Sequence, residues 1–276
     1  MSSLLYEEHA LLGARFAAEG SVPVVASYGH PDAELAGFAD SAALVDLSGV
    51  ATRLIAGVAA PDLCSACFAG VQPEVGECSF QAVLTGDGSV ASVGLLARTG
   101  DREYLCWDLG DRHQVLFAWL EFLAQIEQGG VTPFAGAEVE DVGEHLVPLM
   151  LAGPLAPSIL TDYLREQPLP QAGSIASRRL DETPCLVACL PFGAGDAFLV
   201  LVPPQMARIF WRSFLSFGAV VPAGAHALLP WLADQLPWFE RVAEETDKLT
   251  LPAHVLRTWG LVRREPTFVG ARGLED

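Results

Sequence analysis

Acidic side chains beside turns are the residues of this chain best suited to chemistry. Four aspartates close or follow predicted strands: Asp87, Asp101, Asp108 and Asp196. Asp87 and Asp101 lie in Gly-Asp-Gly and Gly-Asp-Arg, which are typical of turns. Asp196 follows Gly-Ala-Gly and is interpreted as a hairpin residue. Asp108 follows Trp107 at the end of a predicted core strand, and it either faces a central pocket or lies at the surface.

Cysteine and histidine spacing does not predict a metal site. Cys64-x-x-Cys67 is at most half of a zinc site, because its distant partners would be Cys185 and Cys189 in an apolar, strand-like run. We therefore expect the cysteines to be small buried side chains. Six cysteines in 276 residues also do not suggest a secreted disulfide scaffold. The six histidines contain no i, i+4 pair.

Composition limits the classes of function. With 51% hydrophobic and 18% charged residues, the chain can bury a large core in one or two domains. A net charge of −18 disfavours nucleic acid and anionic membrane as partners. There is no run of 18 apolar residues, and acids stand near the N-terminus where a signal peptide would be basic. We expect a soluble, cytoplasmic protein.

The elements that must position these residues follow from hydrophobic periodicity. Helices are predicted over 3–19, 32–43, 61–69, 111–128, 153–163 and 204–217. Strands are predicted over 22–27, 43–47, 52–56, three times within 80–105, and over 138–141, 147–151, 174–180, 185–190 and 197–202. The helix over 111–128 has apolar residues at helical spacing, namely Val115, Leu116, Trp119, Leu120, Leu123 and Ile126.

The same order of strands and helices occurs twice, which suggests an α+β fold made of two duplicated split βαβ, ferredoxin-like modules. We place the first module at 1–168 and the second at 169–276, with a proline-containing hinge over 169–172. The segment 231–276 holds three of the six tryptophans and several prolines, so it is expected to wrap as a tail with short helices.

Six short segments occur in a recognisable order: LYEEHALLGARFAAEG, ALVDLSGVA, FQAVLTGDGSVASVGLLARTGDREYL, MLAGPLAPSILTDYL, AFLVLVP and EPTFVGARGLE. Together they resemble the aminomethyltransferase (glycine cleavage T protein) family over nearly the whole chain. The resemblance implies the family's folate-binding fold, tetrahydrofolate as a candidate cofactor and a place in one-carbon metabolism. Family members of ordinary length continue into a C-terminal β-barrel, whereas this chain stops at Asp276.

The resemblance also indicates which catalytic groups are replaced. In the family, paired aspartates after the turn touch the folate and the amine, and here those positions are Ser92 and Val93. A carboxylate is needed there because the one-carbon unit in transit is cationic. Neither side chain supplies one, so the catalytic residues are unknown.

The cofactor positions are altered in the same way. The family's pterin loop corresponds to 190–194, where Phe192 could still stack on a flat ring. Leu199 stands where a glutamate is expected, and His226 where the arginine that holds the folate tail would be. The residues expected at a cofactor site are therefore Trp107, Asp108, Phe192, Asp196, His226, Trp238 and Phe239.

Three hypotheses follow. The first is a catalytically degenerate relative that binds folate or another flat small molecule weakly. The second is an active tetrahydrofolate-dependent transferase of altered substrate, in which Asp108 or Asp196 replaces the missing acids. The third is a noncatalytic subunit that binds a protein partner, or forms a homo-oligomer, through an exposed apolar tail over 231–259.

Overall fold

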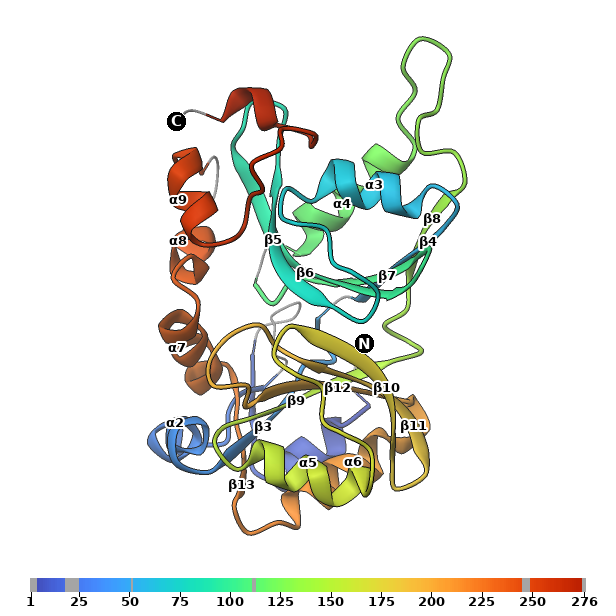
Figure 1. Cartoon of the computed structure of the whole chain (residues 1–276). Coiled ribbons are helices and arrows are strands. Elements are labelled where there is room, and N and C mark those ends of the chain that lie inside the picture. Colours follow the sequence, from blue (N-terminus) through green and yellow to red (C-terminus); the bar gives the residue numbers. More distant parts are fainter. Residues whose placement is uncertain (1–3, 18–24, 51, 111–112, 245–248, 275–276) are drawn as a thin grey trace. The chain divides into compact units, whose positions relative to one another are not determined.

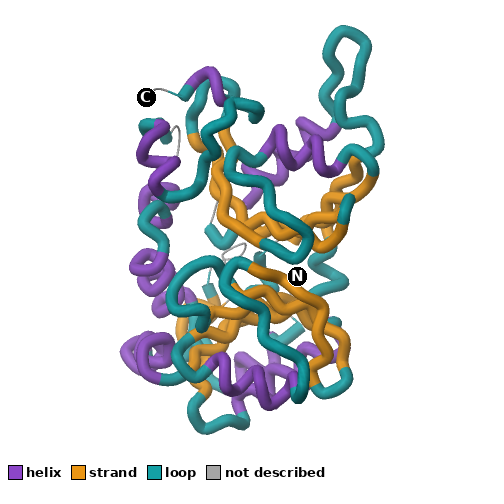
Figure 2. The backbone as a smooth tube through the Cα atoms, viewed as in Figure 1, coloured by secondary structure: helices purple, strands orange, loops and turns teal. Residues whose placement is uncertain are grey.

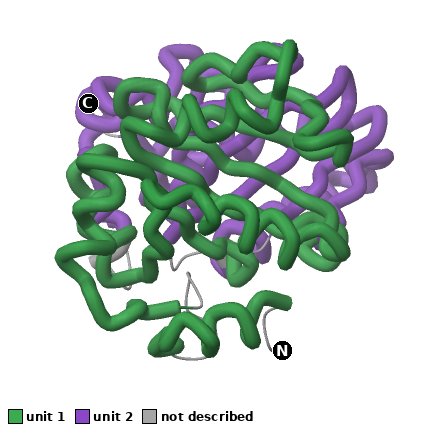
Figure 3. Tube along the Cα trace, turned by 90° about the horizontal axis from the view of Figure 1, so that it is seen from below, with its two compact units in different colours: residues 1–50, 143–236 green, residues 51–142, 237–276 purple. Residues whose placement is uncertain are grey.

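The computed structural model describes residues 4–17, 25–50, 52–110, 113–244 and 249–274. These residues form two compact units, each built from two separate stretches of chain (Figure 3). Unit 1 comprises 1–50 and 143–236, and unit 2 comprises 51–142 and 237–276. Each unit has its own sheet and its own hydrophobic core.

Unit 1 contains a six-stranded sheet in the order β10-β11-β12-β9-β3-β13. Its strands are β3 (Ala42–Asp46), β9 (Val147–Ala152), β10 (Ser174–Leu180), β11 (Thr183–Cys189), β12 (Ala197–Val202) and β13 (Val220–Pro222). All neighbours are antiparallel except β13 and β3. A two-stranded ladder joins β1 (Arg15–Phe16) to β2 (Val25–Ser27). The inner strands β9 and β12 are apolar and buried throughout.

The helices of unit 1 are α1 (Tyr6–Leu11), α2 (Pro31–Asp40), α5 (Ala156–Leu164), α6 (Pro204–Leu215) and α7 (Ala225–Gln235). Helices α5 and α6 lie on one face of the six-stranded sheet (Figures 1 and 2). Proline in the first turn of α2, α5 and α6 suits a helix start, because that position needs no backbone N–H. The core between these two helices and the sheet is centred on Trp211, Phe214 and Phe198.

Unit 2 contains a five-stranded antiparallel sheet in the order β5-β6-β7-β4-β8. Its strands are β4 (Thr52–Gly57), β5 (Cys78–Leu84), β6 (Val90–Gly100), β7 (Glu103–Trp107) and β8 (Ala137–Asp141). Helices α3 (Ala60–Cys67) and α4 (His113–Ala124) cover one face (Figure 1). The C-terminal stretch adds α8 (Phe239–Glu244), α9 (Ala253–Thr258) and a 3₁₀ turn (Ala271–Gly273). Acidic, exposed residues on edge strand β8 discourage pairing with another chain.

The mixed α+β fold predicted from the sequence is confirmed, but the chain divides differently from the boundary expected at 168/169. Residues on both sides of that boundary belong to unit 1, and the expected hinge over 169–172 lies inside it. The reason is strand pairing between distant segments: Leu44 of β3 lies opposite Leu151 of β9, and Leu54 of β4 lies opposite Glu140 of β8. Local periodicity does not report such pairing.

Some helices are shorter than the hydrophobic periodicity predicted. The first helix ends at Leu11 and is followed by β1, and α4 ends at Ala124. Part of the predicted strand over 22–27 lies outside the described residues. Within the described part of the chain, no helix is long and apolar enough to cross a membrane.

The predicted tail is tied to unit 2 through backbone pairing and one arginine. The amide of Ala82 donates to Leu261 O at 3.0 Å, and the amide of Arg263 donates to Ala69 O at 2.7 Å. The buried guanidinium of Arg263 donates to the carbonyls of Ser65 (2.7 Å), Phe68 (2.7 Å) and Gly70 (3.0 Å). These carbonyls lie in and just after the last turn of α3, where a helix leaves acceptors without partners.

Replacing Arg263 by methionine removes these donors and leaves buried carbonyls unsatisfied, so we expect a loss of about 3 kcal/mol in the free energy of unfolding. The matched control is Arg264→Met, because Arg264 is the exposed neighbour. Its effect should stay within about 0.5 kcal/mol. Urea denaturation of the two variants measures both values, and equal losses would contradict the role assigned to Arg263.

All six cysteines are buried, as was predicted from the sequence. Burial raises the pKa of Cys64, Cys67 and Cys106, and it raises the pKa of Cys185 to about 12 and of Cys189 to about 11. No cluster of three or more metal-ligating side chains occurs among the described residues.

The raised thiol pKa values have two measurable consequences. At pH 8 the thiolate fraction of Cys189 is about one in a thousand, and all six thiols are buried, so a thiol reagent should label none of the six cysteines of the native protein within minutes. All six should react after denaturation. Because the unfolded thiols lose their protons first, stability should also fall as the pH rises above about 9. Rapid labelling of the cysteines in the native protein would contradict the burial of their thiols.

Candidate functional site

Ser92, which replaces the first expected acid, lies beside a carboxylate from another strand. Its buried hydroxyl donates to Asp108 Oδ2, and the amide of Gly110 donates to Asp108 Oδ1 at 2.7 Å. Asp108 is only 3% exposed. It follows β7 and shapes the turn that leads toward α4, so it is neither a surface residue nor a side chain without support. A carboxylate is therefore present next to position 92, although position 92 does not supply it.

Ser92 and Val93 point to opposite faces of the five-stranded sheet, since successive strand residues alternate. Ser92 lies opposite Val83, which belongs to the core under α3 and α4. Val93 shares the other face with Leu95 and with Trp107, which lies opposite Leu95. The carboxylate of Asp108 thus accompanies only the first of the two replaced positions.

Two polar atoms on the Val93 face have no partner among the described residues. Trp107 lies directly opposite Thr52 in the β4–β7 ladder, and both side chains are fully buried. Neither Trp107 Nε1 nor Thr52 Oγ1 makes a hydrogen bond within that part of the chain. An unsatisfied buried donor costs about 1–3 kcal/mol, so such atoms commonly mark a place where a ligand or water binds.

The same face carries aromatic rings toward the edge of the sheet. Phe80 lies opposite Leu95, which pairs in turn with Trp107. The ring centroid of Trp238 is 5.2 Å from that of Phe80 and 5.9 Å from that of Phe239. Of the expected cofactor residues, Trp107, Trp238 and Phe239 therefore belong to unit 2 with Asp108, and all four are buried.

The other expected residues belong to unit 1. Phe192, in the loop between β11 and β12, packs edge-on against Trp231 with ring centroids 5.5 Å apart. Trp231 stacks on Phe38 at 4.5 Å. His226 is exposed in the first turn of α7. The structure thus places an aromatic cluster beside the loop over 190–194.

Asp196 lies just before β12, as the hairpin interpretation predicted. A side chain at Gly193 would come within 3.1 Å of Asp196 Oδ1 and within 3.4 Å of Gln235 Oε1. Two polar side chains thus converge on a glycine in the loop that carries Phe192. Leu199, where a glutamate was expected, is buried in β12 and is 1% exposed.

Unit 1 also contains a buried polar network that was not predicted from the sequence. His9 Nε2 is 2.8 Å from Asp46 Oδ2, and His9 Nδ1 is 2.8 Å from the hydroxyl of Tyr28. Burial raises the pKa of Tyr28, and the carboxylates of Asp46 and Glu34 add to the shift. A histidine within a short amphipathic helix and an aspartate ending an apolar strand were the available signals.

The prediction that the tail over 231–259 exposes its apolar residues is wrong for the aromatic residues that the structure describes. Trp238 and Phe239 are buried, and Trp231 and Trp259 are half-buried. The apolar residues of this stretch are used for packing within the units, because aromatic side chains gain most when removed from water. The tail therefore does not offer the contact surface that the third hypothesis required.

Comparisons with known proteins identify the family. A model of the GCVT N-terminal domain matches residues 5–232. The chain therefore belongs to the glycine cleavage T protein family, as its sequence motifs predicted. No curated protein matches the chain.

Among solved structures, the fold is similar to that of the glycine cleavage system aminomethyltransferase T from Bartonella henselae. The TM-score is 0.75 and the identity 19%, over 98% of this chain and 72% of the other. A second match, heterotetrameric sarcosine oxidase from Corynebacterium sp. U-96, has a TM-score of 0.46 and 16% identity over 67% of this chain and 89% of the other. The first similarity establishes the aminomethyltransferase fold.

The described residues fit a flat cofactor of the tetrahydrofolate type only in part. Aromatic rings and the two unpartnered donors, Trp107 Nε1 and Thr52 Oγ1, suit a ring with hydrogen-bond acceptors. The expected acid positions 93 and 199 are apolar and buried, so they cannot bind a polar ring edge.

The Ser92–Asp108 pair can be tested by restoring the family's acid. In Ser92→Asp, two buried carboxylates would meet, and one would keep its proton. The folded pKa of that group would rise above its unfolded value, so the variant should lose stability as the pH rises. We expect a loss of about 3 kcal/mol at pH 7.5 and a smaller loss at pH 4.5.

The matched control is the double variant S92D/D108N, which moves the carboxylate from position 108 to position 92. The pair then still contains a single carboxylate. It should recover most of the stability and lose the added pH dependence. Thermal denaturation at both pH values measures the difference from the parent protein. Equal destabilisation at pH 4.5 and 7.5 would argue against close contact between the two side chains.

Proposed function

We propose that the chain is a catalytically degenerate member of the glycine cleavage T protein family that binds tetrahydrofolate, or another flat ligand, weakly. The observation that carries the proposal is the character of the replaced positions. Ser92 is a buried donor, and Val93 and Leu199 are buried apolar side chains. None of them provides the anion that would stabilise a cationic one-carbon unit in transit.

Retained features support ligand binding. The unpartnered donors of Trp107 and Thr52 would gain hydrogen bonds from a ligand on their face of the sheet. In unit 1, Phe192 and Trp231 offer aromatic surface, with Asp196 close to Gly193. Such groups bind a flat ring without performing transfer chemistry. A role in cytoplasmic one-carbon metabolism follows from this proposal.

A second candidate is an active one-carbon transferase with an altered substrate. One observation favours it: Asp108 places a carboxylate in hydrogen-bond contact with Ser92. In this alternative Asp108 takes the role of the missing acid. The two candidates differ in whether Asp108 acts on a ligand or only supports the turn through Ser92 and Gly110.

Calorimetric titration with tetrahydrofolate tests the first candidate. We expect binding with a Kd between about 10 µM and 1 mM, and quenching of tryptophan fluorescence. Aminomethyl transfer to tetrahydrofolate should not exceed the rate without protein. Absence of binding at millimolar ligand would refute the proposed function.

Asp108→Asn separates the candidates, and Asp101→Asn is its control because Asp101 is an exposed turn residue. For the degenerate protein, both variants should change the Kd by less than about twofold. For an active transferase, turnover should be measurable in the parent and fall at least about a hundredfold in Asp108→Asn alone.

A further inference from the structure

Helix α4 carries two apolar stripes, of which one is buried and the other is largely exposed. Leu116, Leu120 and Leu123 recur at i, i+4 and i+7 and are buried against the sheet of unit 2. A second set recurs at i, i+3, i+4 and i+7: Val115, Ala118, Trp119 and Phe122. We call this second set the α4 stripe. A helix that is apolar on all sides is normally covered on all sides.

The α4 stripe is exposed. Val115 is 47% and Phe122 is 54% exposed, Ala118 is exposed, and Trp119 is half-buried. Trp119 and Phe122 stack with ring centroids 5.4 Å apart. The predicted helix placed Val115 and Trp119 with the core residues; the structure corrects this for Val115, whereas Trp119 packs partly against the core. Pre-ordered aromatic rings at a surface are typical of contacts that supply binding energy to a partner.

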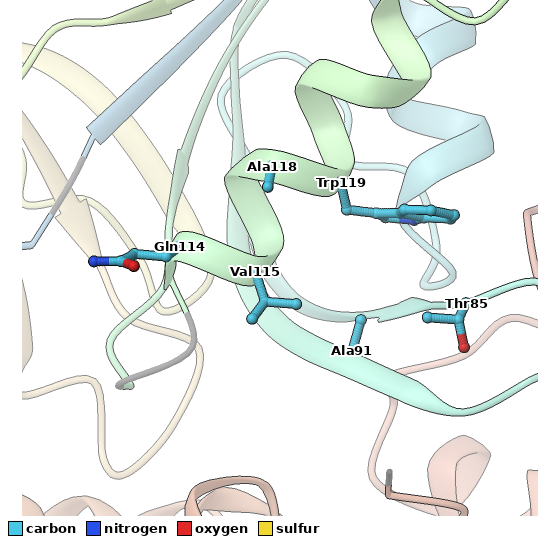
Figure 4. A pocket seen from close by; sticks show the side chains of 6 residues that line it. All are labelled: Thr85, Ala91, Gln114, Val115, Ala118 and Trp119. Carbon is cyan, nitrogen blue, oxygen red and sulfur yellow. The ribbon is translucent and has the colours of Figure 1, made fainter. Parts of the chain in front are cut away.

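A groove of about 430 Å³ runs beside this stripe (Figure 4). Its wall on the helix side is formed by Val115, Ala118 and Trp119, and the sheet side by Thr85 and Ala91. Small residues thus form a hollow next to large rings. This surface shape suits the binding of an amphipathic helix whose apolar residues, at i, i+3, i+4 and i+7, enter the groove.

The charges around the groove indicate the chemistry of the partner. Glu121, one turn from Ala118, is 50% exposed. It lies 3.6 Å from the guanidinium of Arg53, which also contacts Asp141. Across the groove, Thr85 Oγ1 donates to Asp87 at 2.7 Å, which places a second acid beside the lining. The chain as a whole carries −18.

We propose that the α4 stripe and its groove form a docking site for a basic amphipathic helix of a partner protein. Apolar residues of that helix fill the hollow beside Trp119 and Phe122. Its flanking lysines or arginines face Glu121 and Asp87, since complementary charge directs the encounter and fixes orientation. A second copy of this chain would bring the same acids together, so charge disfavours it as the occupant.

Three synthetic peptides of about 18 residues test the proposal by fluorescence anisotropy at about 0.15 M salt, where weak surface attraction is screened. The first has leucines at i, i+3, i+4 and i+7 with lysine flanks. The second keeps the leucines with glutamate flanks, and the third keeps the lysines without the apolar face. We expect the first to bind at least about tenfold more tightly than the others.

Phe122→Gln should raise the Kd of the first peptide by about tenfold, because the substitution removes the exposed ring and retains a helix-forming residue. The control is Ile209→Gln, which changes an equally exposed apolar residue (56%) on α6 and should leave binding unchanged. Neither residue takes part in the proposed folate site, so tetrahydrofolate binding should be the same in both variants.

Three results would overturn the proposal. One is absence of binding by the leucine–lysine peptide, or equal binding by the lysine peptide without an apolar face. Another is binding that Phe122→Gln leaves unchanged. The third is a dimer in light scattering that Phe122→Gln converts to a monomer, which would assign the α4 stripe to a second copy of the chain.

Discussion

Antiparallel pairing between distant strands is the constraint on which the rest of the structure depends. The chain passes from β3 to β4 and later returns from β8 to β9, with β3 paired to β9 in one sheet and β4 paired to β8 in the other. The amide of Val142 donates to Thr52 O at 3.0 Å where the second sheet ends. Each unit must therefore use two stretches of sequence.

Backbone pairing also determines where the functional positions lie. Ser92 and Val93 are neighbours in sequence, but the pleat directs them to opposite faces of the sheet. One meets the carboxylate of Asp108, and the other shares a face with the unpartnered donors of Trp107 and Thr52. Two residues that are adjacent in the sequence thus have different surroundings.

Packing decides which aromatic residues remain available for contact. Trp238 and Phe239 are buried in unit 2, whereas Phe122 on α4 is more than half exposed. Both regions contain large aromatic residues. The difference arises because α4 packs against the sheet through Leu116, Leu120 and Leu123, which cover one side of the helix. On another side of α4, Val115 and Phe122 remain about half exposed.

The sequence by itself determined the family, the mixed fold, the buried thiols and the turn positions of Asp87 and Asp196, because these depend on local patterns and collinear motifs. Only the tertiary structure decided the division into units, the Ser92–Asp108 contact, the burial of the tail and the exposure of the α4 stripe. These features depend on pairing and packing between residues far apart in the chain, and periodicity along the chain carries no information about such distances.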